Sequence, residues 1–135
     1  MKILVIDTGG QIAAALGTIE AKLVCFSDEI QALNAAEQQP ELIVLNYAIR
    51  DEQTPDYIRL LLAASLRSNL LVVGDKVHED DVFRCLLSGA KGFQDLQRLA
   101  QYSEKLVRVV MQGEAWVTRK MVTRLLDAIQ QLKPV

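Results

Sequence analysis

Four short apolar runs, separated by helical patterns, constrain the fold of this 135-residue chain more than any other feature. None of them alternates apolar with polar residues, which is typical of strands covered on both faces of a parallel sheet. The runs lie at residues 3–6, 23–26, 42–45 and 70–73, and a weaker fifth run lies at 91–93. Strict alternation of strand and helix, with short connections, predicts a single α/β domain built on a parallel sheet.

Helical patterns fill the gaps between the runs. They extend over residues 11–20, 27–36 and 55–66, from 78 to a stop at Gly89, and from 102 to a stop at Gly113. Glycine ends helices readily because it adopts the left-handed conformation without a Cβ clash. The alternation therefore continues to the end of the fifth helix without an internal repeat or a flexible linker.

The composition excludes several classes of protein. No apolar run approaches the ~20 residues that a membrane span needs, and the short apolar start is no signal peptide because it ends at Asp7. Cys25 and Cys85 lack metal-ligand spacing, and His78 is the only histidine. We therefore expect a cytoplasmic protein with two buried structural thiols and with neither metal nor cofactor.

Charge is distributed unevenly along the chain. Residues 1–97 carry a net charge of −6 and residues 98–135 a net charge of +4. The acidic body should not bind a nucleic-acid backbone by itself. The basic tail is either a binding surface or, as is more common, the solvated face of a helix.

The stretch Ile6-Asp7-Thr8-Gly9-Gly10 has three interpretations. It looks like the catalytic loop of an aspartic protease, but proteases of that type are nearly all β, and this chain is rich in helix. It also looks like the phosphate loop of a sugar kinase, but such a kinase needs a hydroxyl residue where Gln11 stands, and a second domain. The third interpretation is a strand that ends in an acidic residue before a helix.

Five segments, in order, carry a resemblance to one family. They are KILVID at 2–7, PELIVLN at 40–46, LLVVG at 70–74, GAKGF at 89–93 and GEAWVT at 113–118. Together, over about 130 residues, they resemble a bacterial response-regulator receiver domain, most closely of the LuxR-type (NarL/FixJ) branch. The resemblance implies a doubly wound five-stranded parallel sheet of order 2-1-3-4-5, flavodoxin-like, with helices on both faces and an extra C-terminal helix. Residues 1–113 would form the receiver-like domain, and 114–135 an extension helix and the start of a linker.

The resemblance also locates a pocket beyond the carboxyl ends of the strands. The family needs an acceptor aspartate, two acidic residues for Mg²⁺, a Ser or Thr, and a lysine. The corresponding positions here hold Asn46, Asp7 with Thr8, Gly74 and Leu96. An amide cannot form an acyl phosphate, and one carboxylate is a poor Mg²⁺ ligand set. We therefore expect a degenerate pocket with no catalytic residue, no phosphoacceptor and no metal, where Asp7 caps the next turn or helix.

Protein contacts are the function that such a domain retains. The last helix carries an apolar stripe of Met121, Val122, Leu125, Leu126 and Ile129. Phe83 and Leu87 lie off the buried face of the fourth helix and form a second candidate interface. We expect the stripe to pack on a second copy, on the body or on a further domain, with Arg119, Lys120 and Arg124 at the rim of a dimer.

The resemblance leaves two functions open. The first is a phosphorylation-independent receiver-like domain of a LuxR-type two-component transcriptional regulator, not an enzyme, with a helix-turn-helix DNA-binding domain after Val135. Such a domain would be a homodimer and would reach DNA only through that further domain. The second is a stand-alone receiver-like adaptor that binds a protein or a small ligand.

Overall fold

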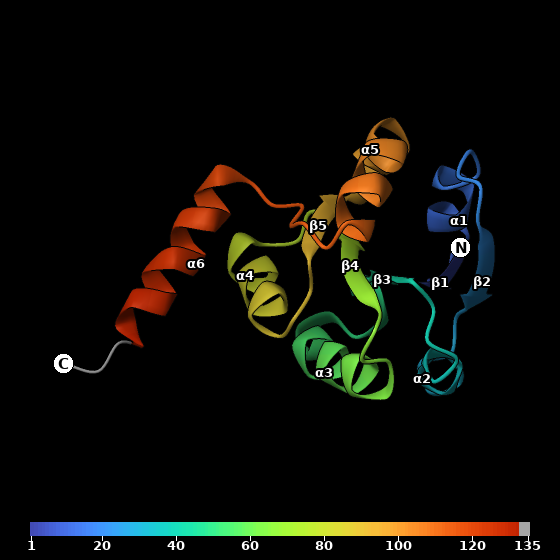
Figure 1. The fold of residues 1–135 in the computed structure, drawn as a ribbon, viewed down its shortest axis with the longest axis horizontal. Helices are drawn as coiled ribbons and strands as arrows, with labels where there is room; N and C mark the ends of the chain where they lie inside the picture. The colour runs from blue at the N-terminus through green and yellow to red at the C-terminus, as the bar shows by residue number, and fades with distance from the viewer. Residues whose placement is uncertain (133–135) are drawn as a thin grey trace.

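The computed structural model describes residues 1–132 and contains a five-stranded parallel sheet between two layers of helices (Figure 1). The strands are β1 (Lys2–Ile6), β2 (Lys22–Phe26), β3 (Leu42–Asn46), β4 (Asn69–Gly74) and β5 (Gly92–Asp95). They pair in the order β2-β1-β3-β4-β5, and every pairing is parallel. The expected fold class and strand order are confirmed.

Helices cover both faces of the sheet. They are α1 (Gln11–Ala15), α2 (Glu29–Ala36), α3 (Thr54–Ala64), α4 (Glu79–Leu87), α5 (Leu99–Met111) and α6 (Arg119–Gln131). One core cluster joins the sheet to α1 and α5, and the other joins it to α2, α3 and α4. Figure 1 shows α6 beside α4, on the side of α4 away from the sheet. None of the helices within residues 1–132 is long and apolar enough to cross a membrane.

Capping residues set several helix ends. The side chain of Asp28 accepts from two backbone N–H groups at the start of α2, and Thr118 does so from one at the start of α6. His78 caps α4, because its Nδ1 accepts from the N–H of Asp80. Gly89 and Gly113 have positive φ angles of 116° and 80° and end α4 and α5.

Two predicted helices are shorter than expected. The first ends at Ala15 and not at residue 20, because the chain turns at Leu16 and reaches Gly17, a poor helix former. The third ends at Ala64, where Ser65 leaves the helical conformation and buries its hydroxyl against that of Ser68. Leu66 therefore lies outside the helix and is 83 % exposed.

The expectation of two buried thiols is wrong for Cys25. This residue is exposed because β2 is an edge strand and the short α1 leaves much of it uncovered. Cys85 on α4 is buried as expected, and burial raises the pKa of its thiol to about 12. Only Cys85 therefore has the unreactive character that we expect of a structural cysteine.

The segment after α5 is tied to the free edge of β5. The N–H of Trp116 donates to the carbonyl of Lys91 at 2.9 Å, and the N–H of Phe93 donates to the carbonyl of Trp116 at 3.1 Å. These bonds form a parallel bridge between Trp116 and Gly92. A Cβ at Gly92 would lie 2.3 Å from the carbonyl oxygen of Trp116, so only glycine permits this approach. The expected linker start at 133–135 lies outside the described residues.

We expect Gly92→Ala to lower the free energy of unfolding by about 1–3 kcal/mol, because the added methyl group must push the 115–117 segment away. Denaturant unfolding of the two proteins measures the difference. Gly9→Ala is the matched control, since a Cβ there meets nothing closer than 3.9 Å. Equal stability of Gly92→Ala and the parent would contradict the close contact.

Candidate functional site

The candidate site lies at the carboxyl ends of the central strands. Asp7 follows β1, Asn46 and Gly74 are the last residues of β3 and β4, and Leu96 follows β5. An open cavity of about 490 Å³ lies here, and Asn46 and Leu96 contribute to its wall. The strand order thus brings together the ends of β1, β3 and β4, as the sequence predicts.

A hydrogen bond between Asn46 and Asp7 occupies the centre of the site. The Nδ2 of Asn46 donates to Oδ1 of Asp7 at 2.8 Å, and Oδ1 of Asn46 accepts from the N–H of Ala48 at 2.9 Å. The carboxylate of Asp7 also accepts from the N–H groups of Thr8 at 2.8 Å and Ile12 at 3.1 Å. The expectation that Asp7 caps the next turn and helix is confirmed.

These bonds keep the Asp7 carboxylate charged. Burial raises the pKa of Asp7, but the hydrogen bonds from Asn46 and from the backbone N–H groups of Ile12 and Thr8 together lower it by more. The net pKa is therefore below its ordinary value. Asp7 contributes stability at neutral pH, and that contribution is lost as the pH falls through the lowered pKa.

A divalent cation, which the receiver fold implies, does not fit this donor set. The amide N–H of Asn46 points at the carboxylate oxygen that a cation would need, and Thr8 adds no carboxylate. An amide nitrogen that donates a hydrogen bond cannot also be a Mg²⁺ ligand. Among residues 1–132, no group of three or more His, Cys, Asp or Glu residues could hold a metal ion.

The space beside Gly74 is filled by its neighbours. A Cβ at Gly74 would lie 2.5 Å from Cγ2 of Val77 and 3.1 Å from Cβ of Tyr47. A Ser or Thr side chain at this position would therefore require the 75–78 loop to move. The hydroxyl that the family uses is absent, and the room for it is absent too.

Leu96 begins a short 3₁₀ helix (Leu96–Arg98) and packs against the core on the α1 and α5 face. Lys76 is the one lysine or arginine among the residues that line the cavity, and the sequence did not point to it. Lys76 has a φ of 53°, and the sequence does not predict this conformation because residues other than glycine rarely adopt a positive φ. The carboxylates of Asp51, Asp75 and Asp81 also line the cavity, so its mouth is acidic overall.

The five residues of the apolar stripe on α6 differ in how far they are exposed. Met121 is 5 % exposed and packs into the body, whereas Leu126 and Ile129 are 56 % and 57 % exposed. Val122 is exposed as well, and Leu125 packs partly against the core. The stripe therefore has a side facing the body and a side facing solvent.

The outer surface of α4 is in contact with α6. Phe83 is partly buried because the Arg124 guanidinium lies 4.2 Å from its ring centroid, while Leu87 is 55 % exposed. Lys120 and Arg124 form ion pairs with the first turn of α4, and their place at the rim of a dimer stays a prediction. Acidic side chains begin α4, and they attract these two cations.

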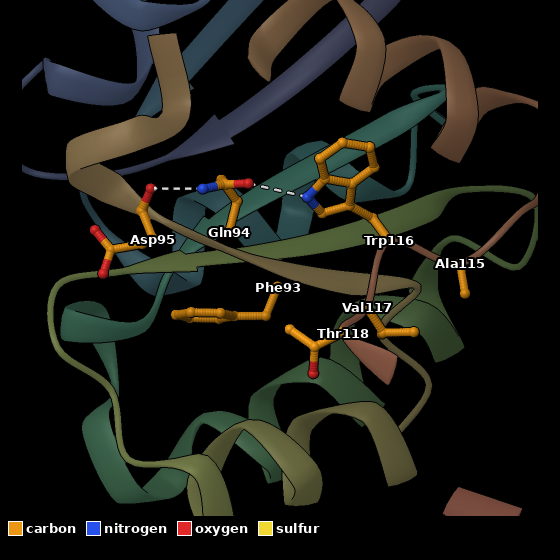
Figure 2. Close-up of a pocket in the computed structure, with 7 residues that line it drawn as sticks. All are labelled: Phe93, Gln94, Asp95, Ala115, Trp116, Val117 and Thr118. Atoms are coloured by element: carbon orange, nitrogen blue, oxygen red, sulfur yellow. Dashed lines mark hydrogen bonds between the residues drawn. The ribbon is translucent and has the colours of Figure 1, made fainter. Parts of the chain in front are cut away.

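A second hollow, shown in Figure 2, lies between β5 and residues 115–118. Trp116 projects from the extension toward Gln94, and its Nε1 donates to Oε1 of Gln94 at 2.9 Å. The Nε2 of Gln94 then donates to the carbonyl of Asp95 at 3.1 Å. The Trp116 ring also lies against Tyr102 of α5, with centroids 6.1 Å apart. These contacts fix the start of the extension on the body.

Several known structures share the fold of this chain. The REC domain of RcsB from Salmonella enterica serovar Typhimurium aligns with a TM-score of 0.77 at 16% identity, over 94% of this chain and 98% of its own. The fold is that of a response-regulator receiver domain. The receiver domain of a Luxo repressor protein from Vibrio parahaemolyticus gives 0.72 at 14% identity, over 83% and 90%.

The signal receiver domain of the response regulator NarL from Mycobacterium tuberculosis gives a TM-score of 0.68 at 17% identity, over 84% of this chain and 97% of its own. No family model and no curated protein matches the sequence. At such identities the likeness establishes the fold, and the chemistry must come from the residues.

We expect Asn46→Asp to lower the free energy of unfolding at pH 8 by about 1–3 kcal/mol, because it replaces a donor by a second carboxylate beside Asp7. Repulsion raises the pKa of one of the two carboxyls, so a proton binds between them as the pH falls, and the loss should be smaller at pH 5. Denaturant unfolding at both pH values measures this. Asn34→Asp, at an exposed position on α2, is the control. An unchanged stability at pH 8 would contradict the Asn46–Asp7 pairing.

Proposed function

We propose that this chain is a receiver-like regulatory domain that works through protein contacts and without phosphoryl transfer. The Asn46–Asp7 hydrogen bond carries this proposal, because it places an amide donor where the chemistry needs a nucleophilic carboxylate and a cation. The filled space at Gly74 and the apolar Leu96 support it, since neither could stabilise a phosphoryl group. The proposed domain is a binding module and not an enzyme.

The proposal extends to a LuxR-type transcriptional regulator in the cytoplasm. The GEAWVT segment at 113–118 and the helix that follows support it, because they resemble the way in which the receiver ends in that branch. In this proposal α6 leads toward a helix-turn-helix domain that carries the DNA contacts. Reading the gene past Val135 separates the proposals: a further basic, helical segment favours the regulator, and a stop codon favours the adaptor.

Treatment with acetyl phosphate and Mg²⁺ should leave the intact mass of the protein unchanged, because no carboxylate stands at the acceptor position. Asn46→Asp alone should also remain unmodified, since Thr8, Gly74 and Leu96 still withhold the other groups. A receiver domain with the complete set of groups serves as the positive control for the reagent. A stable gain of one phosphoryl group by the parent would refute the proposal.

The solvent-facing side of α6 is the proposed contact with a second copy. Val122, Leu126 and Ile129 form a row on it, and each is at least 41 % exposed. Contiguous exposed apolar rows of this kind commonly mark interaction sites. Two copies related by a two-fold axis would each contribute the same row.

We expect the parent to sediment as a dimer at high micromolar concentration, and Leu126→Glu with Ile129→Glu to sediment as a monomer with an unchanged thermal midpoint. The charges disrupt the contact and not the core, because both side chains face solvent. Leu66→Glu is the matched control, since Leu66 is exposed far from α6 in the sequence. A parent that is monomeric at high micromolar concentration would remove the dimer from the proposal.

A further inference from the structure

Helix α6 is held to the body far more weakly than the other long helix at this end of the chain. Both α5 and α6 contain 13 residues, but five residues of α5 are buried and only Met121 of α6 is buried. Most of the stability of a helix in a protein comes from packing of one face. Helix α6 therefore has little packing to keep it in place.

The apolar contact of α6 is narrow and flanked by open space. Met121 belongs to the core cluster that includes Val82, with Val77 and Phe93 packed against it, and these residues also line an open cavity of about 290 Å³. On the other side, a groove of about 240 Å³ runs between Phe83 and the second half of α6. The contact thus consists of one well-buried side chain, Met121, and the partly buried Leu125, with open space on either side.

Charged groups supply the rest of the contact. The Nζ of Lys120 lies 3.2 Å from Oε2 of Glu79, and NH1 of Arg124 lies 3.0 Å from Oδ1 of Asp80. The Arg124 side chain also lies 3.8 Å from Glu79 and covers the face of the Phe83 ring. These pairs are partly exposed, so each is weak and sensitive to salt.

We propose that α6 is a releasable arm, closed over the α4–β5 surface by an ionic clasp of Lys120 and Arg124 with Glu79 and Asp80. In the closed arm, Met121 packs in the core cluster that includes Val82, against which Val77 and Phe93 also pack. Release uncovers this apolar surface. The arm would regulate the contacts of the proposed function, but its test needs neither phosphate nor a partner.

The anchor of the arm limits how far release extends. Trp116 holds the extension to β5 through two backbone hydrogen bonds and to Gln94 through its indole N–H. Release therefore begins after Val117, near the cap that Thr118 provides. The 114–117 segment stays on the sheet edge while α6 moves away from α4.

Hydrogen exchange of the whole chain tests the release. We expect amides of residues 119–131 to exchange at least about tenfold faster than those of 99–111. Raising NaCl from about 0.1 M to about 1 M should accelerate the α6 amides and leave the α5 amides unchanged, because the screening length falls from about 10 Å to about 3 Å. Arg124→Gln should have the same effect at low salt.

Arg119→Gln is the matched control, because Arg119 is exposed on the same helix and no ion pair of Arg119 is recorded among residues 1–132. It removes the same charge and should leave the exchange of α6 unchanged. An α6 that exchanges as slowly as α5, or that ignores both salt and Arg124→Gln, would overturn the proposal.

Thiol labelling distinguishes release from fraying in place. Val82→Cys, in a Cys25→Ser background, places a thiol on the surface that the arm covers, while Cys85 remains as an internal report of wider unfolding. Combining it with Arg124→Gln should raise the labelling rate of the new thiol about tenfold without a change at Cys85. Faster amide exchange with unchanged labelling of the new thiol would show unwinding without release and would overturn the proposal.

Discussion

Burial of the central strands on both faces is the constraint on which the rest of the structure depends. Every residue of β3 is buried, as are those of β1 after Lys2 and those of β4 after Asn69. Such strands can hold polar side chains only where they emerge from the core, at their carboxyl ends. Asp7 and Asn46 meet there because β1 and β3 are neighbours, and each satisfies the other.

The sequence predicted what depends on local chemistry and strand order. The helix stops at Gly89 and Gly113 follow from a rule that acts within a few residues. The meeting of Asp7 with Asn46 follows from the 2-1-3-4-5 order.

Other features depend on tertiary context and could not be predicted. Cys25 is exposed because its strand lies at the edge and α1 is short; the predicted strand order implies the edge position, but not that the first helix ends at Ala15. The position of Lys76 depends on a left-handed backbone at a non-glycine residue. The pairing of Lys120 and Arg124 with α4 depends on the path of the chain through the Trp116 bridge.

Val77 belongs to two surfaces at once, since it fills the space beside Gly74 and also lies under Met121. A mutation that placed a hydroxyl side chain at position 74 would have to displace Val77. It would thereby disturb the packing of α6 on the body. A carboxylate introduced at position 46 would not support phosphoryl transfer by itself either, because it would lie beside Asp7 without a lysine to balance the two negative charges. Single substitutions toward phosphate chemistry would therefore disturb either the Asp7–Asn46 pair or the packing of Val77, so gaining that chemistry would require several coupled changes.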